Sequence, residues 1–81
     1  MSKEVNRLSV QNTCRHLRRL RKEHHYRVDD LARVVGVSRK AVYRWEEDTL
    51  PSLEALYILS QLYGVDMQDL VRGESEQVRD A

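Results

Sequence analysis

The most informative segment of this sequence is residues 28–47, which read VDDLARVVGVSRKAVYRWEE. Its apolar residues recur three or four positions apart, as on one face of a helix, and Gly36 interrupts them. Gly36 can adopt the positive φ of a tight turn, and Ser38 is a favourable N-cap for a new helix. The segment therefore predicts two short helices, residues 28–35 and 39–46, joined by a turn.

The second of these helices presents side chains suited to binding an anion. Its inner face carries Val42 and Trp45, and its outward positions are Ser38, Arg39, Lys40, Tyr43 and Arg44. A helix-turn-helix uses this layout to place a recognition helix in the major groove of DNA. We expect base contacts from Arg39, Lys40, Tyr43 and Arg44, since arginine can donate two hydrogen bonds to guanine. An ordinary solvated helix face is the open alternative.

Three further helices are predicted around this pair. Apolar side chains recur at helical spacing over residues 10–24, Pro51 and Ser52 open a helix over residues 53–63, and Asp66 precedes a short helix through residue 71. No alternation of apolar and polar residues of strand length is present. The predicted fold is all-α, a compact five-helix domain over residues 10–72. Residues 1–9 and 73–81 are expected to form a flexible arm and tail.

The composition is that of a small soluble domain. The 81 residues are 41% hydrophobic and 33% charged, and none of their apolar runs approaches the roughly 18–20 residues of a membrane span. The N-terminus lacks the apolar core of a signal peptide. The single cysteine, Cys14, excludes an internal disulfide and fits a reducing compartment. We therefore expect a cytoplasmic protein with no membrane association.

The sequence does not indicate an enzyme. Three histidines and one cysteine are too few and too badly spaced for a zinc site, and we find neither a nucleophile–base pair nor a phosphate-binding loop. We predict no catalytic residue, no metal and no cofactor, which leaves a binding module. Cys14 and His24 are expected to pack in the core or at its edge, on the inner face of the first helix.

Charge is divided unevenly along the chain. Residues 1–45 hold 12 Lys and Arg against 4 Asp and Glu, whereas residues 46–81 hold 2 against 9. This asymmetry predicts a domain with one anion-facing side, and solvated helix faces of opposite sign are the open alternative. On the first helix the outward residues are Arg15, Arg18, Arg19 and Lys22. We expect DNA backbone contacts from Ser38, Arg19, Lys22 and Arg27.

The chain resembles the Cro/phage-repressor type of helix-turn-helix proteins, also called the Xre family. The matching segments are Leu20-Arg21-Lys22-Glu23, Leu31-Ala32, Val35-Gly36-Val37-Ser38, Trp45-Glu46, Pro51-Ser52-Leu53 and Leu62-Tyr63-Gly64-Val65. The resemblance covers residues 10–72 and implies a lambda-repressor-like five-helix fold, usually acting as a dimer on a palindromic operator. It also implies a buried structural ion pair between Arg21 and Glu46.

The sequence departs from the family pattern at three positions. The family usually has Gln where Val28 stands, Asn-Gly where Glu47-Asp48 stand, and Gly where His25 stands. The first two departures remove polar contacts to the DNA backbone. We expect Asp48 to occupy the left-handed turn position that the family's Gly fills, since Asp tolerates it better than most residues.

Two functions follow from this pattern. The leading one is a sequence-specific transcriptional regulator, a repressor acting as a homodimer on double-stranded DNA. The alternative is a protein-interaction module, antitoxin-like or a regulatory adaptor, with weakened DNA binding and a protein partner. On the fourth helix Ala55, Ile58 and Leu62 lie off the Leu53-Leu56-Leu59-Tyr63 core face. They form a dimer or partner patch, or, as the open alternative, the fifth helix covers Leu62 and Ile58 is a lone exposed apolar residue.

Overall fold

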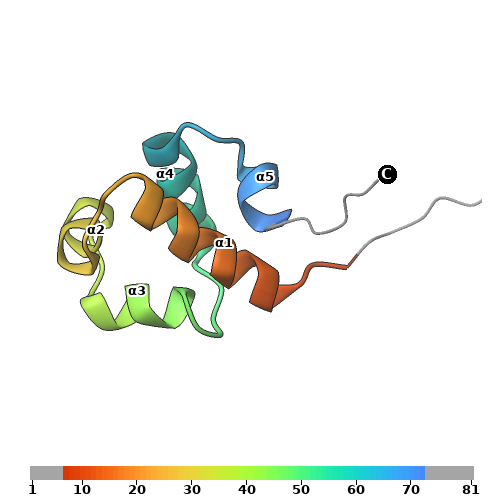
Figure 1. Ribbon diagram of the computed structural model, residues 1–81, viewed down its shortest axis with the longest axis horizontal. Helices are drawn as coiled ribbons and strands as arrows, with labels where there is room; N and C mark the ends of the chain where they lie inside the picture. The colour runs from red at the N-terminus through yellow and green to blue at the C-terminus, as the bar shows by residue number, and fades with distance from the viewer. Residues whose placement is uncertain (1–6, 73–81) are drawn as a thin grey trace, which may run out of the picture.

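The computed structural model describes residues 7–72, which contain five helices and no strand (Figure 1). The helices are α1 (Val10–Glu23), α2 (Val28–Val35), α3 (Arg39–Trp45), α4 (Leu53–Tyr63) and α5 (Met67–Arg72). The predicted all-α fold is confirmed, and each predicted helix end lies within one residue of the observed one. Most of the predicted flexible arm and tail, residues 1–6 and 73–81, lies outside the described residues.

Serine hydroxyls start three of the helices. The side chains of Ser9, Ser38 and Ser52 accept hydrogen bonds from the backbone N–H groups of Asn12, Ala41 and Ala55 at 3.2, 3.1 and 3.1 Å. Each hydroxyl thereby satisfies a donor that the helix itself leaves unpaired. Ser9, which we had assigned to the arm, therefore belongs to the folded domain. Arg27 precedes α2 without a side-chain cap, as its residue type predicts.

Left-handed backbone ends three helices, and one of the residues involved is not glycine. Gly36 and Gly64 have φ of +85° and +70°, and His25 has φ of +63°. The N–H of His25 donates to Lys22 and that of Tyr26 to Arg21, both at 3.0 Å, which is the paired bonding that closes a helix with a left-handed residue. His25 thus takes the family's glycine position, directly after His24, the C-cap of α1.

The expected left-handed conformation of Asp48 is wrong. Among residues 7–72, His25 is the one non-glycine residue with a positive φ. After α3 the N–H groups of Glu47, Asp48 and Thr49 all donate to the carbonyl of Arg44, at 3.1, 3.0 and 2.9 Å. These bonds close the turn without a positive φ, so position 48 does not require a residue that tolerates the left-handed conformation.

The core lies between α1 and the other four helices. In Figure 1, α1 crosses the molecule with α3 on one side and α4 and α5 on the other, while α2 covers one end. α2 packs against α3 and α4, and α5 packs against α1 and α4. The buried side chains come from all five helices and include Leu17, Leu20, Leu31, Val42, Leu59 and Leu70. This packing fixes α3 at the surface with only its inner face covered.

Two apolar residues at helix starts are exposed, although the periodicity of residues 10–24 and the Leu53-Leu56-Leu59-Tyr63 face predicted them on core faces. Leu53 is 74% exposed and Val10 is 38% exposed. Each is the first residue of its helix, where helical periodicity does not indicate whether a neighbour reaches far enough to cover it.

The inner face of α1 also buries polar groups. Thr13 is buried, and its hydroxyl donates to the carbonyl of Val71, which ties α1 to α5. Cys14 is buried as expected, and burial raises the pKa of its thiol, with the negative charge of Asp48 adding to the effect. His24 is exposed, although we expected it in the core or at its edge, and its ring lies against the buried ring of Tyr63 with centroids 4.9 Å apart. Cys14 is therefore a core residue, whereas His24 covers Tyr63 from the surface.

Candidate nucleic-acid interface

The outward face of α3 carries the residues that we expect to read base edges. Arg39, Lys40, Tyr43 and Arg44 are all exposed, while Val42 on the inner face is fully buried and Trp45 is 7% exposed. A hollow runs along the helix, lined by Ser38, Lys40, Ala41, Arg44, Trp45 and Thr49. The structure thus gathers the predicted base-reading residues on one open face, which we call the α3 row.

A rigid turn holds the α3 row in place. The N–H groups of Gly36 and Val37 both donate to the carbonyl of Ala32, at 2.8 and 2.9 Å, and Ser38 then caps α3. A Cβ at Gly36 would meet no atom within 4 Å, so the positive φ alone favours glycine there. These bonds set the position of α3 relative to α2, as a groove-reading helix requires.

One residue of the row is fixed by a carboxylate of α2. Nη1 of Arg39 donates to Oδ1 of Asp29 at 3.1 Å. Within residues 7–72, no side-chain hydrogen bond or ion pair engages Lys40, Tyr43 or Arg44. In the sequence Asp29 is one of two acidic residues in the first turn of the predicted helix 28–35, where they suit the positive end of the helix dipole, and that pattern does not predict the contact with Arg39.

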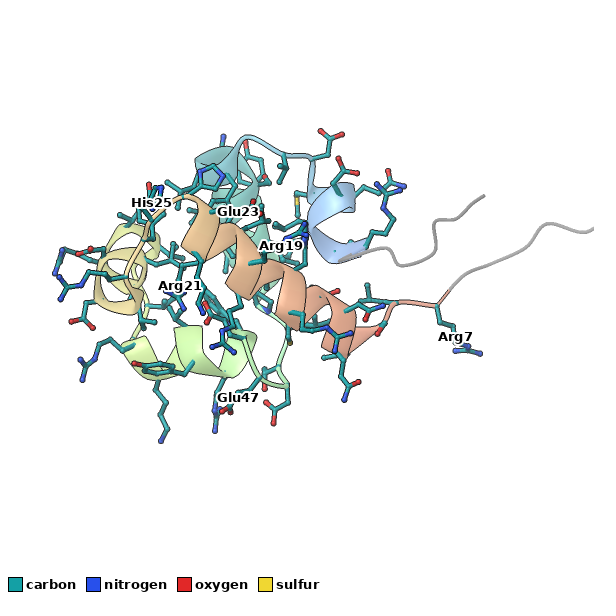
Figure 2. All side chains as sticks on the ribbon, viewed as in Figure 1. Arg7, Arg19, Arg21, Glu23, His25 and Glu47 are labelled. Carbon is teal, nitrogen blue, oxygen red and sulfur yellow. The ribbon has the colours of Figure 1, made fainter. Side chains whose placement is uncertain are left out.

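The loop after α3 brings negative charge next to the row. Glu47 and Asp48 are exposed, and in Figure 2 Glu47 lies at the end of α3 on the side away from α1. The hydroxyl of Thr49 donates to Asp48 at 2.8 Å. Two carboxylates beside a cationic face weaken its attraction for a polyanion.

The structure contains the ion pair that the family resemblance implied. Nε and Nη2 of Arg21 donate to the two carboxylate oxygens of Glu46 at 2.6 and 3.1 Å, and Nη1 donates to the carbonyl of Tyr26 at 2.9 Å. The two side chains are only 13% and 9% exposed. The hydrogen bond to Glu46 raises the pKa of Arg21 despite its burial. One guanidinium thereby joins α1 to Glu46 at the end of α3 and to the carbonyl of Tyr26 in the segment that precedes α2.

The basic residues of α1 are not all near the α3 row. Arg15, Arg18, Arg19 and Lys22 are exposed and line a shallow depression. Figure 2 shows Arg19 and Glu23 on the side of α1 opposite Arg21, which faces α3, and Arg19 pairs with Glu23 at 3.6 Å. The structure therefore does not bring Arg19 together with the row. Arg27 is exposed where the chain enters α2.

The apolar patch expected on α4 has a different composition. Ala55 is 4% exposed and packs inside the core, so its expected place in the patch is wrong. Leu62 is partly buried against the core, and Ile58 is partly exposed. The large exposed apolar side chains of α4 are Leu53 and Tyr57. They lie one helical turn apart on a face that periodicity alone had assigned in part to the core.

Other kinds of site find no support in the described part of the chain. Residues 7–72 contain no group of three or more His, Cys, Asp or Glu that could hold a metal ion. None of the helices described there has the length and apolar character needed to cross a membrane.

Comparison with known proteins places this geometry among DNA-binding domains. A family model described as helix-turn-helix matches residues 17–70. Several proteins of Saccharolobus islandicus named as HTH-type transcriptional regulatory proteins are 36% identical over 70 residues. That match covers 79% of this chain and 23% of theirs, so the chain spans about a quarter of the length of these relatives.

Solved structures share the fold. The DNA-binding domain of the P22 C2 repressor is 30% identical, with a TM-score of 0.71 over 89% of this chain and 96% of that domain. SinR, a master regulator for biofilm formation solved in complex with DNA, is 27% identical, with a TM-score of 0.64 over 72% of this chain and 95% of SinR. The restriction-modification controller protein C.AhdI from Aeromonas hydrophila is 22% identical with a TM-score of 0.67 over 75% of this chain and 94% of that protein, a likeness of fold alone.

Proposed function

Since the chain belongs to the helix-turn-helix family of the Cro/C1 type, we propose that it is a DNA-binding transcriptional regulator whose α3 enters the major groove. The observation that carries this proposal is the α3 row, four long side chains exposed on a helix that a rigid turn and a buried ion pair hold in place. The solved complex of SinR with DNA, a protein of the same fold, supports it.

Each part of the interface has a distinct task in this proposal. Arg39 and Arg44 donate to guanine edges, Lys40 contacts a base or a phosphate, and Tyr43 packs on a thymine methyl or meets a phosphate. Backbone contacts come from Ser38, which caps α3, and from the exposed side chains of Arg27, just before α2, and of Lys22 in α1. Phosphate contacts set the position of the domain on the duplex, and the arginines supply base preference.

We propose further that the regulator is a repressor that acts as a homodimer on a palindromic site. A seven-residue recognition helix reads only a few base pairs, so two copies on two half-sites supply the affinity and specificity that one lacks. Leu53 and Tyr57 are an exposed apolar surface from which such a dimer could be built.

The test is selection of duplexes from a random-sequence pool, followed by binding titrations of the selected and a mixed-sequence duplex at several salt concentrations. We expect tighter binding to the selected duplex and an affinity that falls steeply with salt, because binding releases counterions from the DNA. Arg44→Ala should cost about 1–3 kcal/mol on the selected duplex and less on the mixed one. No enrichment of any sequence, and no binding at about 50 mM salt, would contradict the proposal.

A second candidate function is favoured by the acidic loop. Glu47 and Asp48 are exposed beside the α3 row, and Val28, at the position where the family usually has Gln, packs against the core. A domain that kept the fold but lost DNA contacts would instead bind a protein partner. The salt series separates the two, since this candidate predicts no salt-dependent DNA binding.

A further inference from the structure

Asp29 and Arg39 connect the first turns of the two helices of the motif. Asp29 is the second residue of α2 and Arg39 is the first residue of α3. Arg39 Nη1 and Asp29 Oδ1 lie 3.1 Å apart, and the side chains of Arg39 and Asp29 are 66% and 47% exposed. The pair therefore lies at the surface, at one end of the α3 row.

The pair leaves Arg39 able to bind a base. A guanidinium has five N–H donors in a plane, and the bond to Asp29 uses one of them. A guanine edge offers two acceptors, O6 and N7, and is read by two parallel donors. Arg39 can thus keep its bond to Asp29 and still present a fork to guanine.

Holding Arg39 in advance has an energetic consequence. An arginine side chain loses rotational freedom when it binds, which weakens its contribution, and a carboxylate that already restricts it removes part of that loss. The carboxylate also restricts which acceptor Arg39 can reach, so its hydrogen bonds to a base or phosphate in another position are weaker. At the same time the negative charge of Asp29 opposes any nearby phosphate.

We propose that Asp29 is a positioning residue that sets the base preference of Arg39, at some expense of general DNA affinity. This inference rests on the proposed function, and it goes beyond it by assigning a specificity role to a side chain of α2. Arg44, which no side chain of residues 7–72 engages, is expected to read its base pair independently of Asp29.

The chain offers a matched control in Asp30. It carries the same charge on the same turn of α2, but its partner is Arg33 of the same helix, at 3.4 Å. Asp29→Asn and Asp30→Asn remove equal charge, so any difference between them reports on Arg39. Asp29→Ser serves as a second variant, and thermal unfolding by circular dichroism verifies that each variant is folded.

The experiment measures fluorescence anisotropy with three kinds of duplex: the duplex selected from a random pool by the full chain, its single base-pair variants, and a mixed-sequence duplex. We expect Asp29→Asn to reduce discrimination about two- to tenfold at the base pair where Arg39→Ala relaxes it. Binding of Asp29→Asn to the mixed-sequence duplex should stay equal or tighten. Asp30→Asn should keep the parent discrimination, and Asp29→Asn should add no further loss in the Arg39→Ala background.

Two results would overturn the positioning role alone. One is equal discrimination by the Asp29→Asn and Asp30→Asn variants on the selected duplex and its relatives. The other is a further loss from Asp29→Asn when Arg39 is already Ala, since the effect would then not pass through Arg39. If the parent chain binds no duplex at all, the proposed function fails as well, so the two failures are distinguishable.

Discussion

Tyr63 carries a hydroxyl that is buried without a hydrogen-bond partner in the described part of the protein. Its ring packs against His24 and lies 6.3 Å from that of Tyr26, measured between centroids. Burial raises the pKa of Tyr63, and the negative charge of Glu46 adds to this effect, which the positive charge of Arg21 partly opposes. The ring thus contributes packing, while the hydroxyl loses its hydration and gains no bond in return.

Replacing Tyr63 with Phe should therefore stabilise the protein. We expect Tyr63→Phe to raise the free energy of unfolding by about 1 kcal/mol, measured by urea denaturation near neutral pH. The pKa of Tyr63 is higher in the native protein than in the unfolded chain, so the unfolded chain loses its proton first as the pH rises. The parent therefore keeps its full stability below about pH 10 and loses some above it. The Tyr63→Phe variant should lack this loss. Tyr57→Phe, at an exposed tyrosine, is the control with little expected change. A clear destabilisation by Tyr63→Phe would mean that the hydroxyl has a partner such as an ordered water.

Single residues also show where sequence reasoning reaches its limit. Cys14 was placed in the core by helical periodicity, and the Arg21–Glu46 pair was implied by the family resemblance; both are in the structure. Asp29 was missed as a partner of Arg39. Asp29 suits the start of its own helix without any partner, and only the angle at which the two helices meet brings Arg39 into contact with it. Periodicity within one helix carries no information on that angle.

At the scale of elements, the end of α1 contains a strained position. His25 has φ of +63°, a left-handed conformation that costs an L-residue other than glycine about 1–2 kcal/mol. Glycine adopts this conformation without that cost. It also loses more conformational freedom on folding, which offsets part of the gain in stability. We expect His25→Gly to raise the free energy of unfolding by about 0.5–1 kcal/mol.

His24→Gly is the control for that prediction. His24 has φ of −94°, which needs no glycine, and its ring contacts Tyr63. This variant should lose stability in the same thermal or urea unfolding experiment. If the two variants were destabilised equally, the φ of His25 would not be a source of strain.

The contact between α1 and α3 depends on Arg21. Arg21→Met should lower the free energy of unfolding by about 3–5 kcal/mol, because it leaves the carboxylate of Glu46 buried without a counter-charge. The double variant Arg21→Met/Glu46→Leu should recover much of this loss, since removing both charges removes the uncompensated one. An unchanged denaturation midpoint for Arg21→Met would show that the pair contributes nothing to the fold.

The elements themselves were well predicted because their signals are local. Ser38, Ser52, Gly36 and Gly64 mark helix ends through bonds or dihedrals within a few residues. The expectation for Asp48 failed because a turn can close in more than one way. Three N–H groups bonding to the carbonyl of Arg44 close it without a left-handed residue, and the sequence does not distinguish the two forms.

At the scale of the whole molecule, the distribution of charge decides how the interface meets DNA. The α3 row is cationic, and Glu47 and Asp48 stand three and four residues after its last member, Arg44. At about 6 Å, one carboxylate–phosphate repulsion amounts to roughly 0.7–3 kcal/mol in an effective dielectric of about 80–20, before screening. We infer that this loop lowers general affinity, so that specific base contacts or a second subunit supply the remainder.

Neutralising the loop should therefore tighten binding. We expect Glu47→Gln with Asp48→Asn to increase affinity for selected and mixed-sequence duplexes alike, and most at low salt, where the Debye length exceeds about 10 Å. Glu54→Gln with Asp66→Asn, at two exposed acidic residues outside the loop, is a control with the same change in net charge. Unchanged or weaker affinity in the double variant, measured by anisotropy at two salt concentrations, would mean that the loop does not face the DNA backbone.

Packing between helices explains the errors at this scale. Ala55 is covered and Leu53 is not, although helical periodicity assigned them to the opposite environments. Which residues of α4 are covered depends on the positions of α2 and α5, which pack against it. The exposed character of the α3 row was predicted correctly because Val42 and Trp45 leave only one face of that short helix for the core.

The measurement that bears most directly on the role of α3 is a titration of the ¹⁵N-labelled protein with the selected duplex, followed by amide chemical shifts. We predict that the largest changes at saturation fall on residues 36–49 and on the first turn of α2, with small changes along α4. Large changes elsewhere, with the amides of α3 unchanged at saturating duplex, would contradict the proposal that α3 enters the groove.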